Sequence, residues 1–256
     1  MSFDLTMKPF SGAGIVSLYP LTNGVPGAGI DMGEVPTFDI GQEAPVAEMK
    51  TSRDQSRATA FRMAQSKAAT LNLQLNTLND ATLAMLTSGT WTDVAAGAAV
   101  VGWAAPAGLV VGNVIRLPNR NVSAVTVKDS TGAPKVLTAG TNYELDAVAG
   151  TVRLLDITTG GAFVQPFKVD FTPGAVSVLG AFKAPDQDWL VMLNGTNAYN
   201  GDRVILEGFK FRFGAQGQSK WISNDYGQWQ INGSLLLDTT RAANSTGGQF
   251  YSLTKV

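Results

Sequence analysis

Two residue types with reactive side chains are missing from this 256-residue sequence, which contains no cysteine and no histidine. Without cysteine the chain has no disulfide, no thiolate metal ligand and no cysteine nucleophile. Without histidine it lacks the commonest general base, the commonest zinc ligand and any Ser-His-Asp triad. These absences disfavour hydrolases and metalloenzymes, so we expect no enzyme activity, no cofactor and no bound metal.

Charged residues are also scarce, at 15% of the chain, against about 25% in typical soluble domains. The formal net charge is −1, so the sequence lacks the basic surplus of a nucleic-acid binder. Together with 28 glycines and 11 prolines, the low charge suggests a loop-rich fold whose surface is partly buried against other subunits. A β protein with a neutral, polar surface is the simpler alternative.

No segment predicts a signal peptide or a membrane anchor. Residues 1–8 lack the positive start and apolar core of a signal peptide. Residues 94–115 are uncharged and long enough to span a bilayer, but Pro106 and four glycines interrupt them. We expect loops and a buried strand there, and no contact with a membrane.

Alternation of apolar and polar residues is typical of half-buried strands, and it is clearest at residues 69–76. Leu71, Leu73 and Leu75 alternate there with Asn72, Gln74 and Asn76. Residues 58–63 precede this strand and are predicted to pair with it as a hairpin. A short helix is predicted next, capped by Thr77 and stopped at Gly89, which must dock on a sheet to be stable.

Further strand patterns recur about every ten residues, the rhythm of an antiparallel sandwich or barrel. In residues 204–213 the phenylalanines at 209, 211 and 213 are predicted to face one way, and Lys210 and Arg212 the other. The predicted fold is therefore mainly β, an antiparallel β-sandwich or barrel with one short flanking α-helix. The predicted strands lie at residues 14–19, 34–40, 110–117, 124–127, 143–145, 152–155, 167–171, 189–193, 204–213 and 229–237.

We divide the chain into a core domain of residues 1–94 and 166–241, a β-rich elaboration or small inserted domain of residues 95–165, and a flexible tail of residues 242–256. Residues 41–57 form a long polar stretch within the core domain. We interpret this stretch as a contact arm, with an ordinary solvated loop as the alternative. Its charged residues are Glu43, Glu48, Lys50, Arg53, Asp54 and Arg57.

Three patterns in the sequence superficially resemble chemical sites. The glycine-rich stretches at residues 12–14 and 27–33 fit turns better than phosphate loops, because neither has the required spacing. The carboxylate pairs Glu144/Asp146 and Asp186/Asp188 match no calcium loop. The aromatics favour core or subunit contacts over a sugar-binding platform; they are Trp189, Trp221, Tyr226 and Trp229.

Three stretches together resemble the major tail tube proteins of long-tailed, siphovirus-type bacteriophages. The first is Gly33-Glu-Val-Pro-Thr-Phe38 followed by Lys50-Thr-Ser-Arg-Asp54, and the second is the strand and helix of residues 71–89. The third is Asn194-Gly-Thr-Asn and Gly201-Asp202, followed by Asp225-Tyr-Gly-Gln-Trp229 and Gly233. The likeness covers about half of the chain, and residues 95–165 fit it less well.

The resemblance implies a structural virion protein that forms homo-hexameric rings, which stack into a tail tube and conduct viral DNA during ejection. It implies assembly in the host cytoplasm, and contacts with tail terminator, tape measure and baseplate-type proteins. Viral DNA would pass through transiently and without specific binding. We expect the wall of this conduit to include Asn72, Gln74, Asn76, Lys210 and Arg212. The two cations would then need acidic neighbours, since a net-positive bore would hold DNA.

Two other readings remain open. One is a different phage tail or capsid component, and the other is a carbohydrate-binding or adhesin module that uses Trp221, Tyr226 and Trp229. Saturable sugar binding by a monomer would favour the module, whereas rings or tubes would exclude it.

Overall fold

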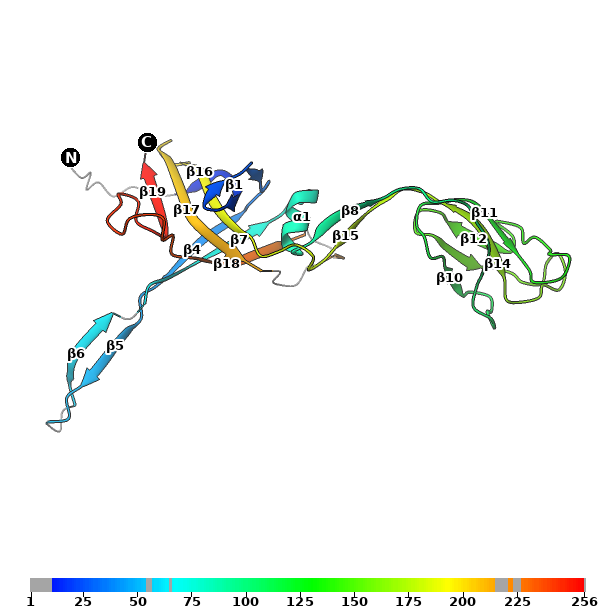
Figure 1. Ribbon diagram of the computed structural model, residues 1–256, viewed down its shortest axis with the longest axis horizontal. Coiled ribbons are helices and arrows are strands. Elements are labelled where there is room, and N and C mark those ends of the chain that lie inside the picture. Colours follow the sequence, from blue (N-terminus) through cyan, green and yellow to red (C-terminus); the bar gives the residue numbers. More distant parts are fainter. Residues whose placement is uncertain (1–10, 54–56, 65, 215–220, 223–226, 256) are drawn as a thin grey trace. The chain divides into compact units, whose positions relative to one another are not determined.

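The protein is mainly β, with antiparallel sheets and one short helix, as the sequence predicts (Figure 1). This computed structural model describes residues 11–53, 57–64, 66–214, 221–222 and 227–255. The chain divides into two compact units. Unit 1 comprises Met1–Thr90 and Gly180–Val256, and unit 2 comprises Trp91–Leu179.

Nineteen strands and one helix make up the described chain. The elements of unit 1 are β1 (Gly12–Thr22), β2 (Val25–Pro26), β3 (Ile30–Asp31), β4 (Thr37–Glu43), β5 (Val46–Lys50), β6 (Thr59–Ala64), β7 (Ala68–Leu75), α1 (Asp80–Leu86), β16 (Asp188–Asn197), β17 (Arg203–Phe213), β18 (Trp229–Leu235) and β19 (Tyr251–Lys255). The remaining strands are β8 (Thr90–Val94), β9 (Val100–Ala104), β10 (Val114–Arg116), β11 (Val122–Lys128), β12 (Tyr143–Asp146), β13 (Thr151–Leu154), β14 (Lys168–Pro173) and β15 (Val176–Gly180).

A nine-stranded sheet forms the centre of unit 1. Its main path runs β2-β1-β16-β17-β18-β7-β4, with β19 paired to β17 and β3 paired to β1. The period-2 pattern decides which side is buried, because successive residues of a strand point to opposite faces. Leu71, Leu73 and Leu75 of β7 are buried in one core cluster with Phe211 of β17 and Ile231 of β18. The sheet is open, and within the described residues no sheet closes into a barrel.

Helix α1 adds Met85 to this core and begins two residues later than the sequence predicts. Its N-cap is Asn79, whose Oδ1 accepts a hydrogen bond from the Thr82 backbone N–H at 2.8 Å. The Thr82 hydroxyl in turn accepts from the Asn79 N–H at 2.8 Å, which completes a capping box. Thr77, the predicted cap, instead accepts from the Glu34 N–H at 2.9 Å. The helix ends at Leu86 with Thr87 as C-cap, so Gly89 is not its stop.

Unit 2 is a β-sandwich of two three-stranded antiparallel sheets, ordered β10-β13-β12 and β11-β14-β9. One core cluster takes side chains from both sheets. Val152 and Leu154 of β13 come from the first, and Val169 and Phe171 of β14 from the second. Strands β8 and β15 pair with each other as a separate ribbon.

The predicted hairpin of residues 58–63 and 69–75 is wrong. β6 pairs with β5, from Val46 opposite Ala64 to Lys50 opposite Thr59. β7 instead lies between β18 and β4 in the large sheet. The predicted arm is thus a two-stranded hairpin at its base rather than a loop throughout. Sequence alone favours pairing between adjacent segments. β7 instead pairs with β18 and β4, which are not adjacent to it in the sequence.

The unit boundaries also differ from the predicted ones. The second unit continues to Leu179 instead of ending at residue 165, because β14 is the central strand of its second sheet. The predicted flexible tail is structured in part, since Tyr251–Lys255 forms β19 and pairs with β17 from Gly208 to Val204. The tail therefore completes unit 1.

A register shift corrects the predicted facing of the phenylalanines in β17. The pairing with β16 is irregular between Trp189 and Val191. Phe211 and Phe213 pack in the core cluster as predicted. Phe209 is buried elsewhere, with the Arg241 guanidinium 3.5 Å from the centre of its ring. A β-bulge reverses the alternation locally, and sequence periodicity does not reveal it.

Candidate functional site

A row of neutral amide side chains crosses the large sheet on the face opposite the core. Asn72 of β7 stands opposite Asn232 of β18, and Gln74 stands opposite Gln230. On the other side of β7, Asp39 and Thr37 of β4 oppose the same two residues. These six side chains border a shallow hollow of about 270 Å³. Amides offer donors and acceptors without charge, so the hollow is polar and neutral apart from Asp39.

The predicted residue Asn76 lies just past the end of β7 and is exposed. Its backbone N–H donates to the Glu34 carbonyl at 3.0 Å. Asn72 and Gln74 are therefore the members of the predicted set that belong to the amide row. Asn232 and Gln230 complete the row, and the alternation of residues 229–235 could have identified them beforehand.

Arg212 lies on this same polar face, as its register shows. It opposes Ser234 of β18, which in turn opposes Thr70 of β7, two residues from Asn72. Because side chains repeat every second residue on one face, Arg212 and the amide row share a surface. The strand register thus brings together Asn72, Gln74 and Arg212, and Lys210 joins them through Asp188, which pairs with both cations.

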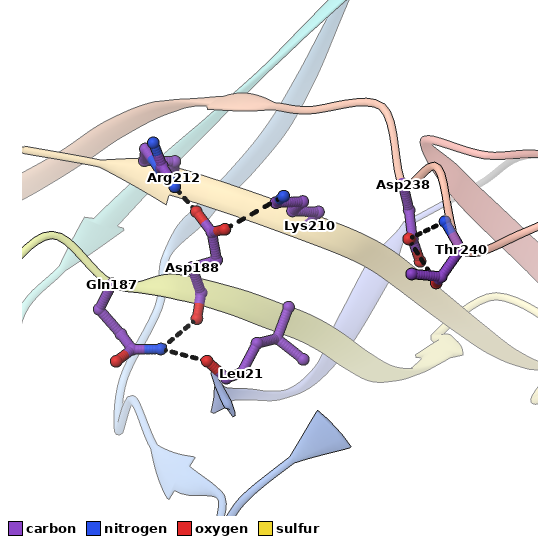
Figure 2. Close-up of polar contacts among 7 residues, drawn as sticks. All are labelled: Leu21, Gln187, Asp188, Lys210, Arg212, Asp238 and Thr240. Carbon is purple, nitrogen blue, oxygen red and sulfur yellow. Dashed lines mark hydrogen bonds and ion pairs between the residues drawn. The ribbon is translucent and has the colours of Figure 1, made fainter. Parts of the chain in front are cut away.

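An acidic residue stands beside both predicted cations. Asp188 of β16 accepts from Arg212 Nε at 2.5 Å and pairs with Lys210 Nζ at 3.3 Å (Figure 2). Gln187 next to it donates its side-chain N–H to the Leu21 carbonyl at 2.7 Å and to the Asp188 carbonyl at 2.8 Å. These bonds hold the start of β16 against the end of β1. The acidic neighbour required by the sequence argument is therefore Asp188.

The protonation of Asp188 follows from this geometry. Partial burial raises the pKa of the Asp188 carboxyl, but the hydrogen bonds and charges of Arg212 and Lys210 outweigh it, and the net pKa lies below the ordinary value. The same contact raises the pKa of Arg212. The Asp188 carboxylate is therefore stabilised in its charged form between Arg212 and Lys210. Asp39 is a further acidic residue on the same face, in the amide row.

We expect Asp188→Asn to lower the free energy of unfolding of unit 1 at pH 7 by about 1 kcal/mol, since Arg212 and Lys210 are partly exposed and water screens the pair. A depressed folded-state pKa gives stability that is present above the unfolded pKa and lost as pH falls through the folded value. The difference between variant and parent should therefore shrink in acid and in high salt. Urea denaturation at several pH values measures it.

Asp186→Asn is the matched control, because Asp186 is exposed and forms no ion pair within the described chain. It should change stability by less than about 0.5 kcal/mol. An Asp188→Asn effect that persists unchanged at low pH would contradict the ion-pair account.

The predicted arm residues cluster around the β5–β6 hairpin. Glu48 pairs with Arg62 at 3.4 Å, and Lys50 ends β5. Glu43 lies at the end of β4, and Arg53 and Arg57 lie in the connection, where Arg57 has a left-handed φ of 46°. Asp54 lies outside the described residues. Sequence reasoning missed the exposed apolar face of this hairpin, although the alternation of residues 46–50 and 59–63 carries the signal.

Within the described residues, the aromatic side chains considered for sugar binding do not form a single platform. Trp189 is buried in the core with its ring 6.1 Å from that of Phe213. Trp221 is 67% exposed, and Trp229 is half-buried and packs against the core cluster. Tyr226 lies outside the described residues.

The remaining acidic residues form no metal site within the described chain. The part that the structure describes contains no group of three or more acidic residues placed to hold a metal ion. The two carboxylates of the pair Asp186/Asp188 do not act together, because Asp188 forms the ion pairs with Lys210 and Arg212 and Asp186 forms neither. The helix of the described chain, α1, has seven residues, too few to cross a bilayer.

Comparison with known proteins gives a family but no activity. No curated protein matches the chain. Residues 9–254, nearly the whole chain, match the family described as Protein of unknown function UCP028589. The chain belongs to this family.

Proposed function

We propose that the protein is a structural subunit that assembles with copies of itself into rings, which stack into the tail tube of a long-tailed bacteriophage. The observation that carries this proposal is the large sheet of unit 1, which combines open edges with a neutral polar face. The sequence likeness to tail tube proteins described above supports it, and the family assignment is neutral because it names no function.

Both edges of the sheet can accept another strand. Within the described residues β4 pairs only with β7, which leaves seven residues of backbone with one side unpaired. At the other edge, β3 and β2 pair with β1 at Ser17–Leu18 and Leu21–Thr22, and the Val16 and Pro20 carbonyls accept from the Met32 and Gly27 N–H groups, so the first residues of β1, Gly12–Ile15, are the part that these segments leave uncovered. Exposed edges readily pair with other chains, and a closed ring of subunits removes them. Edge pairing between copies would continue the sheet around a ring.

The two faces of the large sheet differ in polarity, as the wall of a tube requires. The buried face holds the apolar core and α1, while the other face presents Asn72, Gln74 and their amide partners to water. On that face Asp188 and Asp39 offset Lys210 and Arg212. A balanced surface lacks the counterion-release attraction that makes basic grooves hold DNA. A lumen lined this way would let DNA pass without retaining it.

Negative-stain microscopy of the purified protein tests the proposal. We expect rings with a central hole, and stacked tubes at higher concentration. A protein that stays monomeric at high concentration would contradict it. Saturable binding of a glycan by that monomer would support the carbohydrate-binding alternative, for which Trp221 offers an exposed aromatic ring.

A further inference from the structure

An apolar groove lies in unit 1 between helix α1 and the segment that leads into β16. Its volume is about 340 Å³. Two backbone hydrogen bonds fix the segment to the end of the helix, from Phe182 N–H to the Thr87 carbonyl at 3.0 Å and from Ala184 N–H to the Ser88 carbonyl at 2.9 Å. The lining is mostly apolar and includes Ala81, Ala84, Met85, Pro185, Trp189 and Phe213. The groove is thus a preformed apolar site.

The β5–β6 hairpin carries an apolar face that no described strand covers. Met49 stands opposite Phe61, and Met63 follows on the same face two residues from Phe61. These side chains are 57%, 68% and 67% exposed, respectively. Glu48 and Arg62 form their ion pair on the opposite face. An isolated two-stranded hairpin is at best marginally stable in water, so this apolar face calls for a partner surface.

The charges of the two surfaces are complementary. Asp186 is the charged residue among those that line the groove, and no cation lines it. In the hairpin, Glu48 is already paired with Arg62. The sequence of the turn then has three cations, Lys50, Arg53 and Arg57, against one acid, Asp54, so its net charge is positive. An apolar contact with a cationic rim therefore matches an apolar groove with an acidic rim.

The hairpin and the groove lie at opposite ends of β7, so the natural occupant is a second copy. The hairpin precedes Ala68, the first residue of β7, whereas α1 follows Leu75, its last residue (Figure 1). Eight residues of strand separate the two sites by roughly 27 Å, at about 3.4 Å per residue. Two different complementary patches on one chain produce head-to-tail association, in which each copy both donates a hairpin and accepts one.

We propose that the β5–β6 hairpin of one copy inserts Met49, Phe61 and Met63 into the α1 groove of a second copy. This contact deepens the proposed function and rests on it for the identity of the partner. It differs from edge pairing, because the contact is made by apolar side chains and not by backbone hydrogen bonds along the β4 or β1 edge. In this contact, Asp186 at the rim of the groove would attract the cations of the hairpin turn, and this attraction would orient the two copies.

Cysteine cross-linking tests this contact without a background, because the natural chain has no cysteine. Phe61→Cys and Ala81→Cys variants are prepared separately, mixed, assembled and oxidised. A disulfide requires Cα atoms within about 7 Å, so a mixed dimer reports contact between copies. The matched control replaces Phe61→Cys with Glu48→Cys, which places the thiol on the other face of the same hairpin. We expect at least about tenfold more mixed dimer from the first pair, since contact raises effective concentration.

The outcomes separate this contact from the proposed function. Rings or tubes that form while both pairs cross-link equally, or not at all, overturn the hairpin contact and leave the tube proposal standing. A protein that remains monomeric and does not cross-link overturns both. If Ala81→Cys alone impairs folding, as circular dichroism would show, Ala84→Cys in the same groove replaces it with the same expected ratio.

Discussion

The isolated fragment of residues 91–179 is expected to fold, whereas the shorter fragment of residues 95–165 is expected to stay unfolded. The shorter fragment lacks β14, the central strand of the β11-β14-β9 sheet. It loses Phe167, Val169 and Phe171, which are all fully buried. Removing one buried Phe side chain alone costs about 3–5 kcal/mol. The two phenylalanines alone amount to about 6–10 kcal/mol, which is comparable with the whole of the roughly 5–15 kcal/mol that holds a typical domain folded.

Circular dichroism and thermal melting distinguish the two fragments. The longer one should show a strand spectrum and a cooperative transition, and the shorter one neither. A third fragment, residues 95–175, keeps β14 and lacks both β8 and β15 entirely. It should fold, because the hydrogen bonds of Gly174 N–H and Asn121 Nδ2 to their partners remain. Cooperative melting of residues 95–165 would show that β14 is not needed for the core.

Phe211→Ala is expected to lower the free energy of unfolding of unit 1 by about 3–5 kcal/mol. Phe211 is fully buried near the end of β17, opposite Trp189 on one side and Leu235 on the other. Its ring lies 5.3 Å from that of Phe213. Truncation leaves a cavity among strands that pair on both sides and have little freedom to close it. Denaturant titration followed by tryptophan fluorescence measures the loss.

The matched control is Phe182→Ala, because the Phe182 side chain is 79% exposed. This variant should differ from the parent by less than about 0.5 kcal/mol. Unit 2 has its own core cluster, so its unfolding transition should not move in either variant. Equal shifts of both transitions in Phe211→Ala would instead mean that the two units unfold as one.

Much of unit 1 follows from local sequence pattern. The alternation around Leu71–Leu75 identifies a strand, its buried face and its polar face, because pleating alone sends successive side chains to opposite sides. The same argument places Asn72 and Gln74 on one surface. It also predicts that Lys210 and Arg212 need an acidic neighbour, but it does not identify Asp188, which comes from a different strand.

The incorrect predictions concern segments whose local sequence is compatible with more than one structure. Thr77 and Asn79 can both cap a helix, and the choice depends on the backbone of Glu34, 43 residues from Thr77, which takes the Thr77 hydroxyl as its acceptor. Residues 58–63 could pair with either neighbouring strand pattern, and the large sheet takes β7 away from them. Phe209 leaves the predicted face because of an irregular pairing with β16.

By itself the sequence determined that the protein is mainly β, where most strands lie, which of their faces are apolar, and which reactive residues are absent. Those properties depend on residue type and on the short period of a strand. Only the tertiary structure decided the strand order, the extent of unit 2, the acidic partner of the two cations, and the presence in unit 1 of both an exposed apolar hairpin face and an apolar groove. Each of these depends on contacts between segments distant in sequence, whose relative energies no local pattern encodes.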